Sequence, residues 1–212
     1  MAWEGEVSPS RIRKKLGTHN SLQRLIGVLK EKPMRRHLIF TAVLILTVAS
    51  TSFASLCVWR KPDQDIKQFF PTADTYKTEV KEPGSKKSAI EKRIGRKLDA
   101  DEQEFKFFRI IDGGKKIGTI MTHLGKGQYG AIEIVVAIDI NGKVKGVGIQ
   151  RDRERKRAEL RSDKFLGQFK GKTAGDPVAV GKDIKAIPGA EKSSDTVAFS
   201  VKKLLVLNDE IG

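Results

Sequence analysis

The sequence predicts an α+β protein, with a single N-terminal transmembrane helix followed by an extracytoplasmic domain of antiparallel hairpins and packed helices. Three observations support this prediction. Residues 38–58 contain no charged side chain, as expected for a membrane span. Strict apolar alternation precedes Asn141-Gly142, which indicates a β-hairpin. Apolar residues then recur at helical spacing between Val197 and Leu205, which indicates a packed helix near the end of the chain.

The composition suits one medium-sized globular domain with appendages. The 212 residues are 39% hydrophobic and 32% charged. A net charge of +15 would suit nucleic acid or an anionic membrane surface, but only in a compartment where that partner exists. The location of the charged segments therefore decides which partner is expected.

The uncharged run predicts an uncleaved membrane anchor over residues 37–59. At about 1.5 Å per residue, a helix of this length spans the roughly 30 Å core of a bilayer. Arg35 and Arg36 precede the run and Arg60 follows it, which is atypical of a buried core helix. A cleaved signal peptide would require a much shorter segment before the apolar run. The lipid bilayer is therefore an expected partner.

The orientation of the anchor follows from the charges that flank it. Residues 1–36 carry nine lysines and arginines against three acids, which places this basic arm in the cytoplasm. The protein is then predicted to cross the cytoplasmic (inner) membrane once, with a periplasmic or otherwise extracytoplasmic C-terminal domain. This topology argues against nucleic acid as a partner. The only cysteine, Cys57, lies in the predicted span, so the outer domain has no thiolate for a disulfide or a metal cluster.

The basic arm contains one short amphipathic helix by its pattern. Ser21 can cap a helix on which four apolar residues share one face: Leu22, Leu25, Ile26 and Leu29. Such a helix could lie on the inner leaflet with its cations near anionic lipid, or pack against another protein of a complex. The sequence leaves these two alternatives open.

A linker and a helix are predicted to lead into the outer domain. Residues 60–87 are polar and rich in proline, which predicts a linker. The folded domain is then expected over residues 88–212. It begins with Ser88 as the cap of a helix that carries Ile90, Ile94 and Leu98 at helical spacing.

Two antiparallel hairpins are predicted next. Residues 104–111 and 116–124 are strands that flank Asp112-Gly113-Gly114. In the second hairpin, Asn141-Gly142 is a favoured type I′ pair, and the return strand changes phase across Gly146, which indicates a bulge. Every second residue of its first strand is apolar: Ile132, Ile134, Val136, Ile138 and Ile140.

A basic segment over residues 151–161 follows the second hairpin. It is either a solvated charged loop or a set of contacts to phosphate or to an acidic partner, because guanidinium groups pair well with such oxygens. Arg151 and Arg155 are the first candidates for such contacts. A short packed helix is predicted after it from three apolar residues: Phe165, Leu166 and Phe169.

The chain ends with a predicted short strand near Pro177, a turn over residues 186–190 and an amphipathic helix. Four residues should form the apolar side of this helix: Val197, Val201, Leu204 and Leu205. Ser193, Ser194 and Asp195 are all competent N-caps. Backbone N–H groups at the start of such a helix favour an anion.

Four segments, in the same order, resemble the FMN-binding domain of the G and C subunits of Rnf and sodium-pumping NADH:quinone oxidoreductase complexes and of related single-span, membrane-anchored proteins. The resemblance covers roughly residues 88–207. It is carried by "DGGKKIGTI", "IEIVVAIDINGKVKGVGI", "KFLGQFKGK" and "DIKAIPGAEKSSDTV". The last segment is similar to the family pattern Asp-x-x-(Ser/Thr)-Gly-Ala-Thr-x-Ser-Ser-x-x-Val.

The resemblance implies a flavin site at the last of these segments. In the family, FMN is attached through its phosphate to the hydroxyl of the motif Thr, but here Glu191 occupies that position. A carboxylate cannot serve as that acceptor and repels a phosphate, so the motif is degenerate and FMN is expected to be noncovalent or absent. The residues expected to bind it are Gly189, Ala190, Glu191, Lys192, Ser193, Ser194, Thr196, Arg151 and Arg155.

Three functions follow from these observations. The first is electron transfer by a noncovalent flavoprotein that works with other subunits of a membrane redox complex. The second is a flavin-free structural or assembly subunit with the same fold. An independent enzyme is the third, and no catalytic or metal-binding set is expected, because His19, His37 and His123 fall in separate segments. Three acids, Glu133, Asp139 and Glu154, are expected on exposed strand faces.

Overall fold

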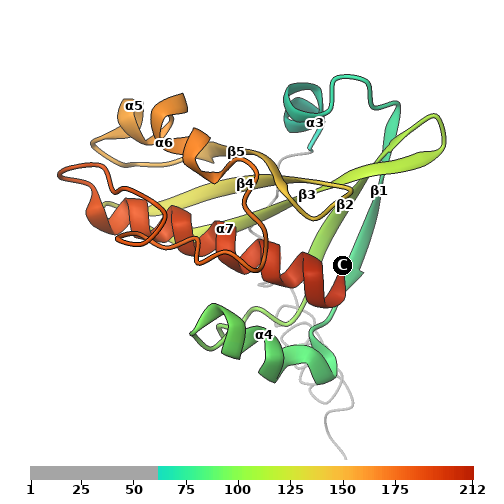
Figure 1. Cartoon of the computed structure of the whole chain (residues 1–212), viewed down its shortest axis with the longest axis horizontal. Coiled ribbons are helices and arrows are strands. Elements are labelled where there is room, and N and C mark those ends of the chain that lie inside the picture. Colours follow the sequence, from blue (N-terminus) through green and yellow to red (C-terminus); the bar gives the residue numbers. More distant parts are fainter. Residues whose placement is uncertain (1–61) are drawn as a thin grey trace, which may run out of the picture. The chain divides into compact units, whose positions relative to one another are not determined.

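The structure is a computed structural model that describes residues 62–212 as a five-stranded antiparallel sheet with helices on both faces (Figure 1). The α+β fold class is therefore confirmed for this part of the chain. The predicted cytoplasmic arm and the predicted anchor over residues 37–59 lie outside the described residues. Among the helices of residues 62–212, none combines the length and the apolar character that a membrane crossing requires.

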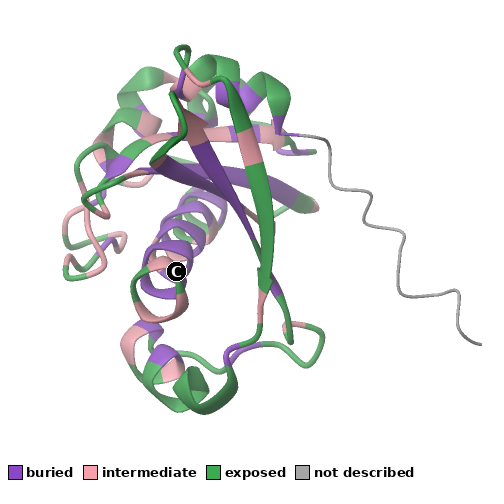
Figure 2. Ribbon diagram, turned by 90° about the vertical axis from the view of Figure 1, so that its right-hand side faces the viewer, coloured by how far each residue is buried: buried purple, intermediate pink, exposed green. Residues whose placement is uncertain are grey.

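The five strands are neighbours in the sheet in the same order as in the chain. Both predicted hairpins are confirmed, since β2 pairs with β3 and β4 with β5. β1 forms one edge and is largely exposed, as its green colour in Figure 2 shows. The strands are β1 (Thr75–Lys81), β2 (Phe105–Asp112), β3 (Lys115–Lys126), β4 (Ala131–Asp139) and β5 (Val144–Arg151).

The turn of the second hairpin differs from the predicted type I′ turn. That turn needs a positive φ at two successive residues, whereas here Gly142 has φ 75° and Asn141 does not lie in the left-handed region. The N–H of Gly142 donates to the carbonyl of Asp139 at 3.1 Å, which places Ile140 inside the loop. Ile140 is therefore 58% exposed and is not part of the apolar face of β4.

The predicted bulge in β5 is confirmed. Ala137 lies opposite Gly146, but Ile138 lies opposite Val144, so Lys145 is an extra residue on the return strand. The bulge lets Val144 and Val147 face the same apolar core, although they are three residues apart. It also leaves Lys145 on the opposite face, where its Nζ lies 4.8 Å from the ring centroid of Phe70.

Two apolar layers cover the two faces of the sheet. On one face, α4 (Lys87–Ile94) and α7 (Glu191–Ile211) pack on β4 residues such as Ile132 and Ile134. On the other face, Ile66 of α3 (Asp63–Phe69) and the adjacent Phe70 pack with Val135 and Ala137. β4 is thus buried from both sides, and all its residues from 132 to 138 are buried.

The prediction of a linker over residues 60–87 is wrong for the described residues 62–87. This segment forms α3, β1 and a 3-10 turn, η1 (Gly84–Lys86), and β1 pairs with β2 along its whole length. The prolines stand at the ends of these elements: Pro62 is the N-cap of α3 and Pro83 the N-cap of η1. They bound short elements of structure rather than marking a flexible tether.

The helices differ from the sequence prediction mainly at their ends. α4 begins at Lys87, so Ser88 is not its cap, and the helix ends where Gly95 adopts φ 71°. Leu98 is nevertheless buried, as predicted, because it joins the same core. The predicted strand near Pro177 is not formed, and an isolated parallel bridge joins Val180 to Ile184 instead.

The predicted helix after the basic segment consists of three short turns. They are α5 (Arg157–Leu160), α6 (Asp163–Leu166) and η2 (Gly167–Phe169). Ser162 caps α6 by accepting a hydrogen bond from the N–H of Phe165 at 3.3 Å. Phe165 and Phe169 are buried, as their spacing predicts, and their rings meet edge to face.

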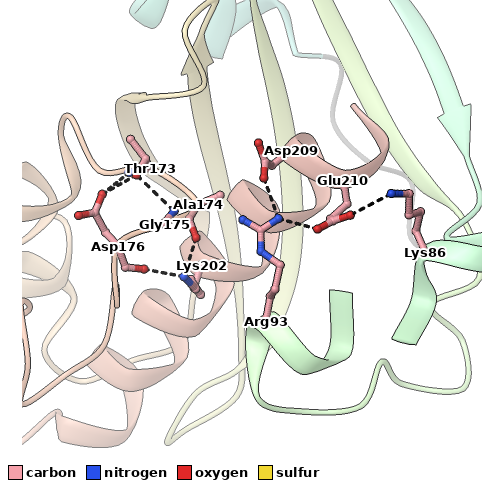
Figure 3. A network of polar contacts seen from close by, with 9 residues as sticks. All are labelled: Lys86, Arg93, Thr173, Ala174, Gly175, Asp176, Lys202, Asp209 and Glu210. Carbon is pink, nitrogen blue, oxygen red and sulfur yellow. Dashed lines mark hydrogen bonds and ion pairs between the residues drawn. The ribbon is translucent and has the colours of Figure 1, made fainter. Parts of the chain in front are cut away.

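Polar contacts fasten α7 to its surroundings at its C-terminal half (Figure 3). Arg93 of α4 donates to Asp209 and Glu210, both at 2.7 Å. Lys202 donates to the carbonyls of Ala174 and Asp176, at 2.8 and 2.5 Å. The long loop before α7 is therefore held to the helix that follows it.

Gly118 tests how tightly α3 is packed against the sheet. A Cβ at Gly118 would lie 2.6 Å from the carbonyl oxygen of Ile138 and would also strike the ring of Phe70. We expect Gly118→Ala to lower the free energy of unfolding in urea by about 1–3 kcal/mol, because the backbone of β4 cannot move aside. Gly167→Ala is the matched control, since no atom lies within 4 Å of its Cβ position. Equal stabilities of the two variants would contradict this packing.

Candidate functional site

The candidate site lies where the N-terminus of α7 meets the loop between β3 and β4 and the segment after β5. Glu154 joins all three parts. Its Oε1 accepts from the N–H of Tyr129 at 3.0 Å, and its Oε2 accepts from the hydroxyl of Ser193 at 2.5 Å. Ser193 in turn accepts from the N–H of Gln128 at 3.3 Å. Three distant segments of the chain thus converge on one buried carboxylate.

Glu191 is the first residue of α7, and its carboxylate folds back over the start of the helix. Gly189, with φ 79°, turns its N–H toward Glu191 and donates to Oε1 at 2.9 Å. This hydrogen bond, together with one from the N–H of Glu191 itself, lowers the pKa of the Glu191 carboxyl below its usual range. The side chain therefore places a negative charge where the helix N-terminus favours an anion.

The two serines of the predicted caps are not caps. α7 begins two residues before Ser193, and both serines lie fully buried within its first turns. Ser194 accepts from the N–H of Ile187 at 3.0 Å and donates to the carbonyl of Ala190 at 2.9 Å. Asp195 lies at the surface, where it pairs with Arg96 at 3.3 Å. The serine hydroxyls therefore hold the turn against the helix.

Acids and arginines alternate in the segment that follows β5. Asp152 and Glu154 point inward and are buried, whereas Arg153 and Arg155 are exposed. Asp152 accepts from Arg161 Nε at 2.9 Å and from the N–H of Glu154 at 3.0 Å. The expectation that Glu154 lies on an exposed strand face is wrong, because buried N–H and guanidinium donors face inward here. It is wrong for Glu133 as well, which is 6% exposed.

The predicted cofactor-binding arginines lie outside this hydrogen-bond network. The guanidinium of Arg155 stacks over the ring of Tyr129, with its carbon 4.5 Å from the ring centroid. The side chain of Arg151 is 77% exposed, and its Nε lies 3.3 Å from Glu133. Lys192 is exposed, and Thr196 donates to the carbonyl of Lys126 at 2.9 Å. The structure therefore brings together the turn residues, Ser193 and Ser194, with the cations around them.

Sequence reasoning missed Glu154 and the loop over residues 127–130. The glycines of this loop are the signal that could have revealed it. A Cβ at Gly127 would collide with the carboxylate of Glu154 and would lie 2.6 Å from Ile132, and a Cβ at Gly130 would contact Arg153. Glycine therefore lets this loop approach the segment after β5 closely.

His123 belongs to a second buried polar cluster, on the α7 face of β3. Its Nδ1 lies 2.8 Å from the hydroxyl of Ser200, and its Nε2 lies 3.3 Å from both Glu102 Oε1 and Lys203 Nζ. Lys203 also donates to Glu102 directly. Ser200 donates to the carbonyl of Thr196 and is fully buried, so this serine is no accessible nucleophile. Among residues 62–212, no group of histidines, cysteines and acids could hold a metal ion.

Comparisons with known proteins bear on this arrangement. No family model matches the sequence. The chain is 37% identical over 99 residues to the G protein component of the proton-translocating ferredoxin:NAD(+) oxidoreductase complex of Clostridium ljungdahlii, here called the ferredoxin-complex relative. The match covers 43% of this chain and 53% of that protein, so the chain spans about half the length of this curated relative. It supports the resemblance to the FMN-binding domain family of Rnf and Nqr subunits.

Two solved structures are also similar. One is NqrC of Shewanella oneidensis, at 15% identity and a TM-score of 0.46, covering 74% of this chain and 92% of that chain. The other is the corresponding C component of the Na(+)-translocating NADH-quinone reductase of Parabacteroides distasonis, at 17% identity and a TM-score of 0.41. It covers 74% of this chain and 87% of that chain.

The residues at the start of α7 do not fit a flavin phosphate in this arrangement. Residue 191 has no hydroxyl that could form a phosphoester. Its carboxylate already accepts from Gly189, and the hydroxyls of Ser193 and Ser194 are buried in other hydrogen bonds. Glu154 adds a second carboxylate next to the first turn of the helix. The two negative charges disfavour an anion at this position.

Ser193→Ala tests whether Glu154 holds the three segments together. The substitution removes a hydrogen bond to a buried carboxylate, so we expect the free energy of unfolding to fall by about 1.5–3 kcal/mol. The neighbouring Lys192→Ala is the control, because Lys192 is exposed and should change stability by no more than about 0.5 kcal/mol. A Ser193→Ala variant as stable as this control would show that the contact contributes little.

The Glu102 cluster predicts a pH dependence of stability. Burial raises the pKa of Glu102, but hydrogen bonds from His123, Lys203 and the N–H of Asp99 outweigh burial and lower the pKa from 4.5 to about 2. The resulting contribution is present above pH 4.5 and is lost as the pH falls toward 2. It corresponds to at most roughly 3 kcal/mol, because solvent screens part of the interaction.

Unfolding in urea between pH 6 and pH 2 measures this contribution. We expect Glu102→Gln to be much less stable than the natural protein at pH 6, and the difference to shrink as the pH approaches 2. Glu104→Gln is the matched control, because Glu104 is exposed in the same loop. A difference between Glu102→Gln and the natural protein that stays constant from pH 6 to pH 2 would contradict the lowered pKa.

Proposed function

We propose that this chain is a subunit of a membrane-bound redox complex and takes part in electron transfer there. The observation that carries the proposal is the match to the ferredoxin-complex relative, at 37% identity. The structure supports it with the frame of the flavin-attachment motif. Gly189 adopts a positive φ, Ala190 precedes the helix, and Ser193 and Ser194 lie in its first turns.

We further propose that a single helix over residues 37–59 anchors the chain in the cytoplasmic membrane. The excess of basic residues in residues 1–36 supports a cytoplasmic N-terminus, so the folded domain would lie on the outer side. The partners in this proposal are the lipid bilayer and other subunits of the complex. Nucleic acid is not among them, because the basic segment of the folded domain would face away from the cytoplasm.

We infer that any FMN carried by the chain is held without a covalent bond. When bound, FMN would supply the redox chemistry, and the protein would supply position and electrostatics. Glu191 is the reason for excluding the covalent bond, since a carboxylate lacks the hydroxyl that accepts the flavin phosphate. The exposed cations Lys192 and Arg155 are the nearest groups that could balance the charge of a bound anion.

A flavin-free structural role in the same complex is the second candidate function. It is favoured by the same contacts at α7, because Glu191 and the two buried serines satisfy one another and the turn without any ligand. In this role the domain would act through its surfaces and its anchor. The two candidates differ in whether the purified protein absorbs visible light.

The absorption spectrum of the full-length protein, purified in detergent from cells that contain the flavin transferase, separates the candidates. We expect no fluorescent flavin band in a denaturing gel, because residue 191 cannot form a phosphoester. A yellow protein without a fluorescent band supports noncovalent FMN, and a colourless protein supports the structural role. A fluorescent band at the size of this chain would contradict our interpretation of Glu191.

The Glu191→Thr variant is the companion experiment in the same cells. It restores the hydroxyl and removes the carboxylate that accepts from Gly189. If the rest of the site is intact, we expect a fluorescent band to appear for this variant. Glu191→Gln is the matched control, because it removes the charge but adds no hydroxyl and should remain dark.

A further inference from the structure

A groove lies on the α3 face of the sheet, on the side of β5 opposite to α7. It has a volume of about 490 Å³, which is in the range of small-molecule sites. One wall is α3, with Gln68 and Phe69, and the other is the α6–η2 segment, with Leu166 and Lys170. Figure 1 shows α3 and α6 standing apart above the same strand. The groove therefore does not involve the turn before α7.

The floor of the groove is flat because it is formed by glycines. Gly146 and Gly148 of β5 line it and present only backbone there. A Cβ at Gly146 would meet the ring of Phe69 at 2.5 Å, so the ring lies against the strand itself. Phe69 and Leu166, both partly exposed, provide apolar surface on the two walls. This shape suits a flat ring that slides between them over the peptide planes.

Two lysines gather at one end of the groove. Val144 exchanges backbone hydrogen bonds with Gly171 and Lys172, both at 2.8 Å, which brings Lys145 close to Lys170. Both lysines are exposed and both line the groove. Within residues 62–212 neither takes part in an ion pair. Two neighbouring ammonium groups that lack an acidic partner favour an anion from outside the chain.

The acids of the groove are placed differently. Asp65 is buried and accepts from the side chain of Gln150, near the opposite end of β5. Asp163 is exposed on the rim, and Arg161 is already bound to Asp152. The positive charge available to a ligand is therefore that of Lys145 and Lys170.

We propose that this groove binds a planar aromatic molecule that carries an anionic group. The ring lies on the glycine floor between Phe69 and Leu166, and the anionic group is bound by Lys145 and Lys170. The site is separate from the turn at α7, and the proposed redox function does not depend on it.

Fluorescence anisotropy of FMN and riboflavin tests the groove, with the full-length protein as titrant. These probes share one ring system and differ by a phosphate. We expect FMN to bind at least about tenfold more tightly than riboflavin, because charged hydrogen bonds add to its affinity. The double variant Lys145→Gln/Lys170→Gln should lose about tenfold or more for FMN and keep its affinity for riboflavin.

The control variants separate this groove from the turn at α7. Lys164→Gln changes the same charge on an exposed residue of α6 outside the groove lining, and should bind FMN as the natural protein does. Lys192→Gln at α7 should also leave binding unchanged. Equal affinity for the two probes, an unaltered double variant, or loss of FMN binding in Lys192→Gln would each overturn the proposal. None of these outcomes bears on the association of the chain with a redox complex.

Discussion

Burial of β4 from both sides is the constraint on which the rest of the structure depends. Ile132 and Ile134 face the helix layer of α4 and α7, and Val135 and Ala137 face α3. An antiparallel strand that is apolar on both faces needs cover on both. α7 packs along one face and presents its N-terminus to the segment after β5. α3 packs on the other face and forms one wall of the groove above the glycines of β5.

The hairpins could be predicted from sequence, but the second layer could not be predicted from alternation alone. Ile132 to Ile138 alternate correctly, and the phase change across Gly146 predicts the bulge. The run between them is in fact continuously apolar, since Val135 and Ala137 fill the other face. This continuity indicates a strand covered on both sides. The covering helix was missed because α3 has only seven residues, between two prolines in a polar segment.

The candidate site shows why residue type alone misplaces charged and hydroxyl groups. Acids and arginines alternate after β5 with the period of extended backbone, and only the partners in the folded chain decide which set points inward. Buried donors are available to Asp152 and Glu154, so the arginines face solvent. Likewise, the position of Glu191 in the motif was visible in the sequence. Its hydrogen bond to Gly189, and the burial of Ser193 and Ser194, needed the structure.

Glu191 takes the place that the family resemblance assigns to a flavin, and this is the central claim about the site. The same fold can then serve a redox complex without a covalent cofactor at α7. The most direct test is the intact mass of the full-length chain, purified from its own host. The account predicts the mass that its residues give, without addition. A mass increased by one FMN phosphoester would contradict it.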